Sequence, residues 1–142
     1  MLESYGEPMK ILVVDDDYVS RKKMEIIMQN FGACDSAKLG EEAIGMFAAA
    51  LESEIPYDLV SLDISMPGIT GIKVLEKIRE IEDYKNITAD LRVKIIMVTS
   101  KSDKDTVVTS VSNGCNDYII KPFSWKIIFN KLVKLKMLKF AQ

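Results

Sequence analysis

The chain has 142 residues, 48% of them hydrophobic, and a formal net charge of −2. This length can bury one sizeable core, and the small net charge provides no overall field that would attract nucleic acid. The sequence contains no histidine. It therefore excludes histidine-based acid–base catalysis, histidine metal sites and a phosphohistidine carried on this chain.

Signals for export or membrane insertion are missing from the sequence. No apolar run reaches the roughly 18 to 20 residues that cross a membrane, and residues 1–8 lack the apolar stretch of a signal peptide. Cys34 and Cys115 lie far apart without CxxC spacing, so we expect reduced thiols. Together these features predict a cytoplasmic protein with no membrane span.

Strand-like and helix-like patterns alternate along the chain. Apolar runs predict five strands, at about residues 11–14, 33–37, 57–62, 93–98 and 118–120. Apolar residues at helical spacing predict four helices, at about 24–31, 44–51, from 71 and from 124, and a polar helix is expected at 103–113. These βα units imply an α/β fold with a doubly wound, five-stranded parallel sheet. We expect an N-terminal extension (1–8), one domain (9–142) and a surface loop at 82–92.

Polar residues follow several of the predicted strands, at the point where each strand ends. Asp15-Asp16-Asp17 follows the first strand, and Asp63 closes the third. Thr99 ends the fourth strand and Lys121 ends the fifth. Ligands of open α/β sheets bind beyond the carboxyl ends of the strands, and a buried carboxylate there is costly for stability alone. Acids, a hydroxyl and an ammonium at one edge suit Mg²⁺ and a phosphoryl group.

Four short motifs carry a family resemblance. They are Val13-Val14-Asp15-Asp16, Leu62-Asp63-Ile64-Ser65-Met66-Pro67-Gly68, Val98-Thr99-Ser100 and Asp117-Tyr118-Ile119-Ile120-Lys121-Pro122-Phe123. Their order at strand ends resembles the response-regulator receiver domain, the phosphoacceptor half of two-component signalling. The resemblance covers about residues 9–138. It implies the flavodoxin-like (βα)5 fold of the stand-alone chemotaxis receivers, with strand order 2-1-3-4-5.

The resemblance also implies a nucleophile and a metal site. Asp63 would be the phosphoacceptor, attacking the phosphohistidine of a histidine kinase or of a histidine phosphotransfer protein. Asp16, Asp63 and the backbone carbonyl of Ser65 would hold Mg²⁺, with Asp15 supporting the ion through water. Such a domain dephosphorylates itself and does not turn over an external substrate, so it is not an enzyme in that sense.

Three further residues have roles implied by the resemblance. Lys121 would pair with a phosphoryl oxygen, and the Thr99 hydroxyl would donate to another. Thr99 and Tyr118 would form the switch, although a β-branched residue and a packed aromatic are also ordinary strand residues. Output would occur by phosphorylation-dependent binding of an unidentified protein, or of a second copy in a homodimer, without direct nucleic-acid binding.

Two other functions fit parts of the sequence. A haloacid-dehalogenase-type phosphatase could use Asp15 and Asp17 as its nucleophile motif, but no Asp or Glu follows Asp117 to supply its later metal ligands, and Asp63 would have no role. The chain could also be the receiver fragment of a longer DNA-binding or enzymatic response regulator. We expect no output domain within this chain.

One predicted helix has an unusual composition. Residues 105–113 consist of valine, threonine, serine, aspartate and asparagine, all middling to poor helix formers. We expect the packing of Val107, Val108 and Val111 to hold this helix in place. Because it follows Thr99 closely, we also expect it to be the soft, two-state element of the switch.

Overall fold

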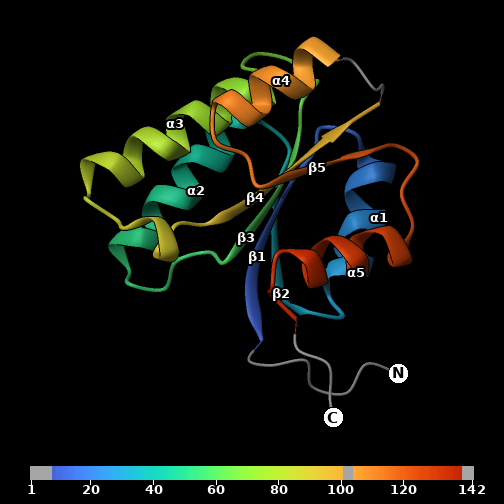
Figure 1. The fold of residues 1–142 in the computed structure, drawn as a ribbon, viewed down its shortest axis with the longest axis horizontal. Coiled ribbons are helices and arrows are strands. Elements are labelled where there is room, and N and C mark those ends of the chain that lie inside the picture. Colours follow the sequence, from blue (N-terminus) through green and yellow to red (C-terminus); the bar gives the residue numbers. More distant parts are fainter. Residues whose placement is uncertain (1–7, 101–103, 139–142) are drawn as a thin grey trace.

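The computed structural model describes residues 8–100 and 104–138 (Figure 1). Its centre is a five-stranded parallel sheet in the order β2-β1-β3-β4-β5. The strands are β1 (Met9–Val14), β2 (Gly32–Ala37), β3 (Leu59–Asp63), β4 (Lys94–Thr99) and β5 (Asp117–Ile120). The predicted α/β class and strand order are therefore confirmed.

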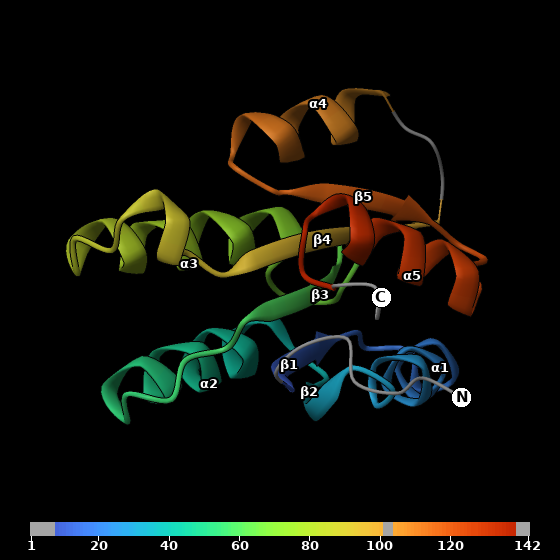
Figure 2. The same cartoon turned by 60° about the horizontal axis from the view of Figure 1, so that its bottom comes forward.

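Helices cover both faces of this sheet (Figure 1), and Figure 2 shows the same layers from a second direction. One face carries α1 (Tyr18–Met28) and α5 (Trp125–Lys134). The other face carries α2 (Gly40–Glu52), α3 (Gly71–Tyr84) and α4 (Lys104–Ser112). A short 3-10 helix, η1 (Ala89–Leu91), precedes β4. Among the described residues, no helix is long and apolar enough to cross a membrane.

Each face of the sheet has its own apolar core. Ile11 and Val13 of β1 pack in the core under α1 and α5, whereas Leu12 and Val14 pack in the core under α2 and α3. All four side chains are at most 1% exposed. A strand buried on both sides has an uninterrupted apolar run. Because the strands are parallel, their carboxyl ends, and the polar residues there, meet at one edge of the sheet.

Side-chain caps fix where three of the helices begin. Asp17 precedes α1, and its Oδ2 accepts the Ser20 N–H at 2.9 Å. Thr70 caps α3 in the same manner, and Ser124 caps α5. The caps of α1 and α3 directly follow the strand-end loops. They therefore hold those loops in a defined conformation at the carboxyl edge.

The predicted surface loop at residues 82–92 is confirmed for residues 85–92, most of which are exposed, but not for its first three residues. Helix α3 continues to Tyr84, and η1 occupies part of the remainder. Glu82 is only 1% exposed, because one carboxylate oxygen accepts from the Arg79 guanidinium and the other accepts the Val93 N–H at 2.8 Å. At Glu82, therefore, a charged residue did not indicate exposure, because its carboxylate is matched by buried partners.

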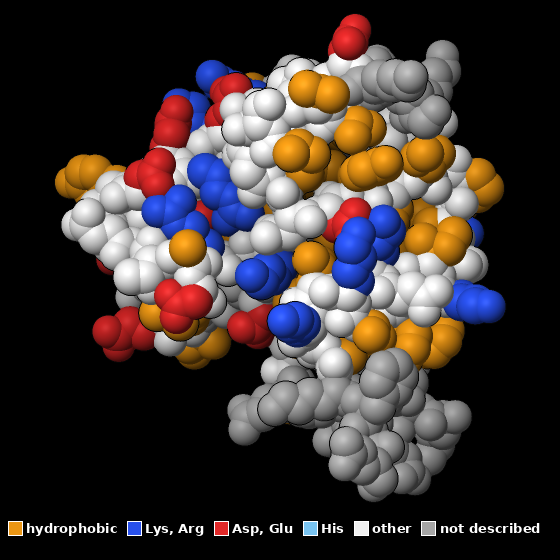
Figure 3. Space-filling view, in the orientation of Figure 1, with side chains coloured by type: hydrophobic (Ala, Val, Ile, Leu, Met, Phe, Trp, Pro, Cys, Tyr) orange, Lys and Arg blue, Asp and Glu red, His pale blue; other side chains and the backbone are white. Residues whose placement is uncertain are grey.

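The expected packing of α4 was also wrong in part. Val108 and Val111 are 63% and 59% exposed, and Val107 is half-buried. Apolar side chains gather on the surface over α4 and β5 (Figure 3). The buried residue of this helix is Ser110, whose hydroxyl donates to the Thr106 carbonyl at 2.9 Å. Helix α4 is thus held by fewer buried apolar side chains than expected.

Candidate phosphoryl-acceptor and metal site

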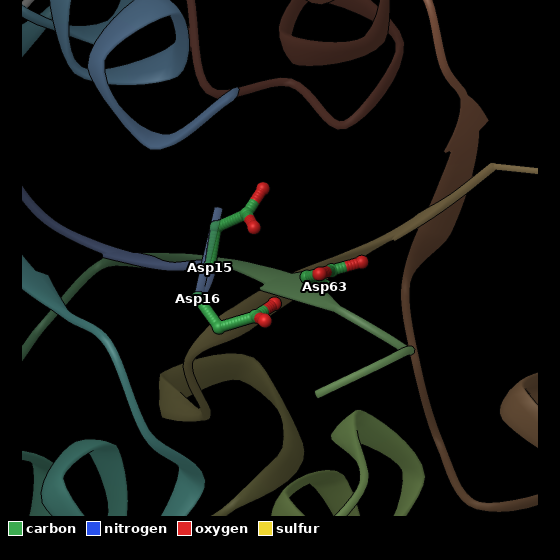
Figure 4. A group of neighbouring side chains, drawn as sticks. All are labelled: Asp15, Asp16 and Asp63. Carbon is green, nitrogen blue, oxygen red and sulfur yellow. The ribbon is translucent and has the colours of Figure 1, made fainter. Parts of the chain in front are cut away.

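Three carboxylates meet at the carboxyl edge of the sheet. Asp15 and Asp16 follow β1, and Asp63 is the last residue of β3 (Figure 4). One oxygen from each of these side chains lies within 4.8 Å of the others. Asp15 and Asp63 are buried, whereas Asp16 is exposed. The sequence placed these three acids at one edge, and the structure brings them together.

Several hydrogen bonds fix the turn that carries Asp15 and Asp16. The Asp15 N–H donates to the Ala37 carbonyl at 3.1 Å, which continues the β1–β2 ladder. Its Oδ1 accepts the Asp17 N–H at 2.9 Å. The Arg21 guanidinium reaches back from α1 and donates to the Asp15 carbonyl at 3.0 Å. Strand and helix therefore both hold this turn.

The backbone around Asp63 is fixed by close contact with α3. The Ile64 N–H donates to the Val98 carbonyl at 2.9 Å, so the pairing with β4 continues past Asp63. Gly71, the first residue of α3, packs against the Asp63 carbonyl, and a Cβ built there would lie only 2.2 Å from that oxygen. Only glycine permits this approach. The start of α3 therefore abuts the site directly.

Lys121 supplies positive charge to the acidic cluster. Its Nζ lies 3.2 Å from Asp15 Oδ2 and 3.7 Å from Asp63 Oδ1. Its backbone N–H donates to the Thr99 carbonyl at 2.7 Å, which fixes the end of β5 against β4. Lys121 thus contacts two of the three carboxylates, and the three acids outnumber Lys121 and Arg21, so the described part of this edge keeps excess negative charge.

The electrostatics of the cluster act most strongly on Asp63. Burial, followed by the neighbouring Asp15 carboxylate, raises the pKa of Asp63 to about 7, although Lys121 opposes this shift. Burial disfavours the ionised form because a low-dielectric surrounding solvates charge poorly. A bound cation would reverse this penalty, since it would favour ionised Asp63. A carboxyl perturbed in this way, in a cluster at a strand end, is a candidate functional group.

The other predicted site residues lie around this cluster. Thr99 is 8% exposed at the end of β4, and Ser65 is exposed in the loop after β3. Tyr118 pairs with Met97 in the β4–β5 register, so alternation places it on the same face of the sheet as Thr99. The Lys131 Nζ lies 5.5 Å from the centre of the half-buried Tyr118 ring. All of them lie near the carboxyl ends of β3, β4 or β5.

The structure separates Asp17 from the other acids. Asp17 is exposed and caps α1 through Oδ2, so it is not part of the described carboxylate cluster. A phosphatase that used Asp15 and Asp17 together would require both carboxylates in the site. Sequence reasoning also missed Arg21, which is 6% exposed. Its only sequence signal was its place on the same helical face as Met24 and Met28.

Comparison with known proteins identifies the family. The family model described as the response regulator receiver domain matches residues 11–133, a range that includes every predicted site residue. The chain belongs to the response-regulator receiver family. This receiver domain is 43% identical to the transcriptional regulatory protein ResD of Bacillus subtilis over 117 residues, which are 81% of this chain and 42% of ResD. The chain therefore spans less than half the length of that relative.

Other members of the receiver family differ in length. The chemotaxis protein CheY of Pseudomonas aeruginosa is 28% identical over 127 residues, covering 89% of this chain and 95% of CheY. Among solved structures, the BeF3-activated receiver domain of Thermotoga maritima DrrB is 25% identical. Its TM-score is 0.72, and the match covers 92% of this chain and 99% of that one. The chain therefore matches some relatives over nearly their whole length and others over only part of it.

Proposed function

We propose that this receiver domain accepts a phosphoryl group on Asp63 from the phosphohistidine of a histidine kinase or a histidine phosphotransfer protein. The observation that carries the proposal is the meeting of Asp15, Asp16 and Asp63 at the carboxyl edge of the sheet, where Lys121 contacts Asp15 and Asp63. Asp63 is the one acid of the three that closes a central strand. Its position next to an ammonium suits a nucleophile that receives an anionic group.

The proposed metal is Mg²⁺. Three carboxylates against the two cations Lys121 and Arg21 leave an excess negative charge that a hard divalent cation would neutralise. Mg²⁺ favours one or two carboxylates together with waters and phosphate oxygens. Asp16, Asp63 and the Ser65 carbonyl would hold the ion, with Asp15 acting through water. When bound, the ion supplies charge neutralisation for the incoming phosphoryl group.

The proposed reaction is a transfer between a nitrogen and an oxygen. A carboxylate oxygen of Asp63 forms the new O–P bond while the N–P bond of the donor breaks, and its electron pair stays on the imidazole nitrogen. Asp63 must be ionised to attack, and its pKa of about 7 makes that step sensitive to Lys121. Lys121 would then pair with one phosphoryl oxygen and Thr99 would donate its hydroxyl to another.

The proposed output is a change in which protein the domain binds. Thr99 and Tyr118 lie on one face of adjacent strands, so movement of Thr99 toward a phosphoryl group would affect the space beside Tyr118. The partner would be an unidentified protein or a second copy of the chain. Residues 9–142 would form the receiver domain. The alternative is a receiver fragment of a longer DNA-binding or enzymatic response regulator, because the match with ResD covers less than half of ResD.

Acetyl phosphate with Mg²⁺ tests the assignment of Asp63. Intact mass should show one added phosphoryl group that is lost in alkali, as expected of an acyl phosphate. Asp63→Asn should abolish the addition. Asp58→Asn is the matched control, because Asp58 directly precedes the same strand at its opposite end and is exposed. Equal labelling of Asp63→Asn, or loss of labelling in Asp58→Asn, would contradict the assignment.

A further inference from the structure

Arg21 is a buried arginine whose charge is not explained by an ion pair. It lies in α1 with 6% exposure, and the described part of the chain places no carboxylate in ion-pair contact with its guanidinium. Arginine is seldom buried to this extent unless it is paired. Its Nη1 instead donates to the Asp15 backbone carbonyl at 3.0 Å, and its Cζ lies 5.5 Å from the centre of the Tyr18 ring.

The carbonyl that Arg21 holds belongs to the peptide between two of the clustered acids. The orientation of the Asp15–Asp16 peptide plane fixes where the Asp16 side chain leaves the backbone, because a peptide is rigid. The Asp17 N–H, one residue further on, donates to Asp15 Oδ1. The hydrogen bond from Arg21 is therefore the contact by which α1 orients the Asp15–Asp16 peptide plane. The orientation of the Asp16 side chain relative to that of Asp15 depends on this plane.

We propose that Arg21 is a positioning residue for the metal site, which it serves through the backbone and not through its charge. The inference rests on the proposed Mg²⁺ site. Its guanidinium holds the Asp15 carbonyl so that the Asp16 carboxylate lies beside that of Asp63. Groups behind metal ligands commonly act in this way, by fixing the direction of a ligand.

This role predicts a change opposite in sign to that of simple electrostatics. Arg21 carries a positive charge near a cation site, so removing that charge alone should strengthen Mg²⁺ binding. Loss of positioning should weaken Mg²⁺ binding instead. The direction of the change in affinity therefore distinguishes a positioning residue from a nearby charge.

The test is Mg²⁺ titration of the full chain by calorimetry, comparing Arg21→Met with Arg92→Met. Arg92 is the matched control because its Nε also donates to a backbone carbonyl, that of Ile87 at 3.0 Å, beside η1. Both variants change the net charge equally. We expect Arg21→Met to weaken Mg²⁺ binding about tenfold and Arg92→Met to leave it unchanged. Unchanged or tighter binding by Arg21→Met would overturn the proposal.

A second readout needs no metal. In the metal-free protein, the Asp17 amide should exchange with solvent faster in Arg21→Met than in Arg92→Met, because its acceptor Asp15 would be less well held. Equal exchange would count against positioning. If Arg21→Met does not fold, Arg21→Lys keeps the charge but loses the planar fork, and it should still bind Mg²⁺ more weakly than the wild type. Wild-type affinity in Arg21→Lys would then overturn the proposal.

Different results would contradict the proposed metal site and the proposed role of Arg21. If the wild-type chain binds no Mg²⁺, or if Asp63→Asn binds it as well as the wild type, the metal site itself is wrong. If the wild type binds Mg²⁺ through Asp63 and Arg21→Met binds it equally well, the site stands and only the role of Arg21 is wrong.

Discussion

The two edges of the sheet both contain buried charge but compensate it differently. At the amino edge, Arg79 donates to the carbonyls of Val93 and Gly114 and to Asn116, and it also forms an ion pair with Glu82. Both Glu82 oxygens accept hydrogen bonds. At the carboxyl edge, three carboxylates have oxygens within 4.8 Å of one another, and the nearby cations are Lys121, which contacts two of them, and Arg21, which contacts a backbone carbonyl.

This difference distinguishes a structural cluster at the amino edge from a candidate binding site at the carboxyl edge. Burial of charge is found at both edges, so burial alone does not indicate function. At the amino edge the donors and acceptors match, and the network closes the loops that precede β4 and β5. At the carboxyl edge the charges do not match until a cation is added. We conclude that uncompensated charge at a strand end is the more informative feature.

The largest expected effect is at the amino edge. Arg79→Met should lower the free energy of unfolding by about 3 to 5 kcal/mol, because it leaves the Glu82 carboxylate buried without its cation. Urea titration would measure this loss. Mg²⁺ affinity of the folded variant should stay at the wild-type value. A mild loss of stability, or a large loss of metal affinity, would contradict the assignment of a structural role to the amino edge and a binding role to the carboxyl edge.

Metal binding should neutralise the excess negative charge at the carboxyl edge and so stabilise the folded state. Mg²⁺ at 100 times its dissociation constant should raise the free energy of unfolding by about 2.7 kcal/mol, as for any ligand that binds only the folded state. Asp63→Asn should lose this gain, whereas Arg79→Met should keep it. The measurement is urea unfolding with and without Mg²⁺. Equal stabilisation of Asp63→Asn would place the ion elsewhere.

The pH dependence of stability should report Asp63 in the metal-free protein. Its pKa is raised from 3.8 to about 7, so the folded state binds a proton that the unfolded state has released. Stability should therefore fall as pH rises from 5 to 7.5. Partial solvent screening limits the loss to about 1 to 2 kcal/mol. No histidine titrates in this window, because the chain contains none.

Two controls sharpen this pH measurement. Asp63→Asn should show little change between pH 5 and 7.5, and it should be at least as stable as the wild type at pH 7.5. The affinity for Mg²⁺ should rise with pH up to about 7, because binding requires ionised Asp63. A wild-type protein that becomes more stable over this interval would contradict the predicted sign.

The smallest expected effect concerns α4. Its amides should exchange faster than those of α1, because Val108 and Val111 are exposed while α1 buries Met24, Ile27 and Met28. Beryllofluoride with Mg²⁺, a phosphoryl mimic, should alter exchange in α4 more than in α1. Hydrogen exchange with mass spectrometry would measure both. Equal protection of the two helices, unaffected by the mimic, would place the switch elsewhere.

The sequence was sufficient for the sheet and for the polar residues at its carboxyl edge. Apolar runs that end in Asp15, Asp63, Thr99 and Lys121 specify both where the strands lie and which polar groups stand at their carboxyl ends. Parallel strands buried on both faces leave little freedom in how those ends are arranged. Local patterns could therefore predict which residues would meet without knowledge of any distance.

Contacts between distant segments could not be predicted in this way. Arg79 finds its partners at Gly114 and Asn116, which are 35 and 37 residues away in sequence. Nothing in the local pattern around Glu82 indicated that a carboxylate there would be buried. Similarly, composition showed that α4 contains valines but not which side of the helix they occupy. Long-range hydrogen bonds decided the position of Arg79, and the packing of α4 against its neighbours decided which valines are exposed.

Helix α3 joins the two edges mechanically. Its first residue, Gly71, rests against the Asp63 carbonyl, and Arg79 and Glu82 near its other end belong to the matched network. At 1.5 Å per residue, its 14 residues span on the order of 20 Å. A helix that is fixed at the amino edge can act as a rigid support for the carboxyl edge. It would resist displacement of the β3 end and confine any movement that begins at Asp63 to the β4, α4 and β5 side.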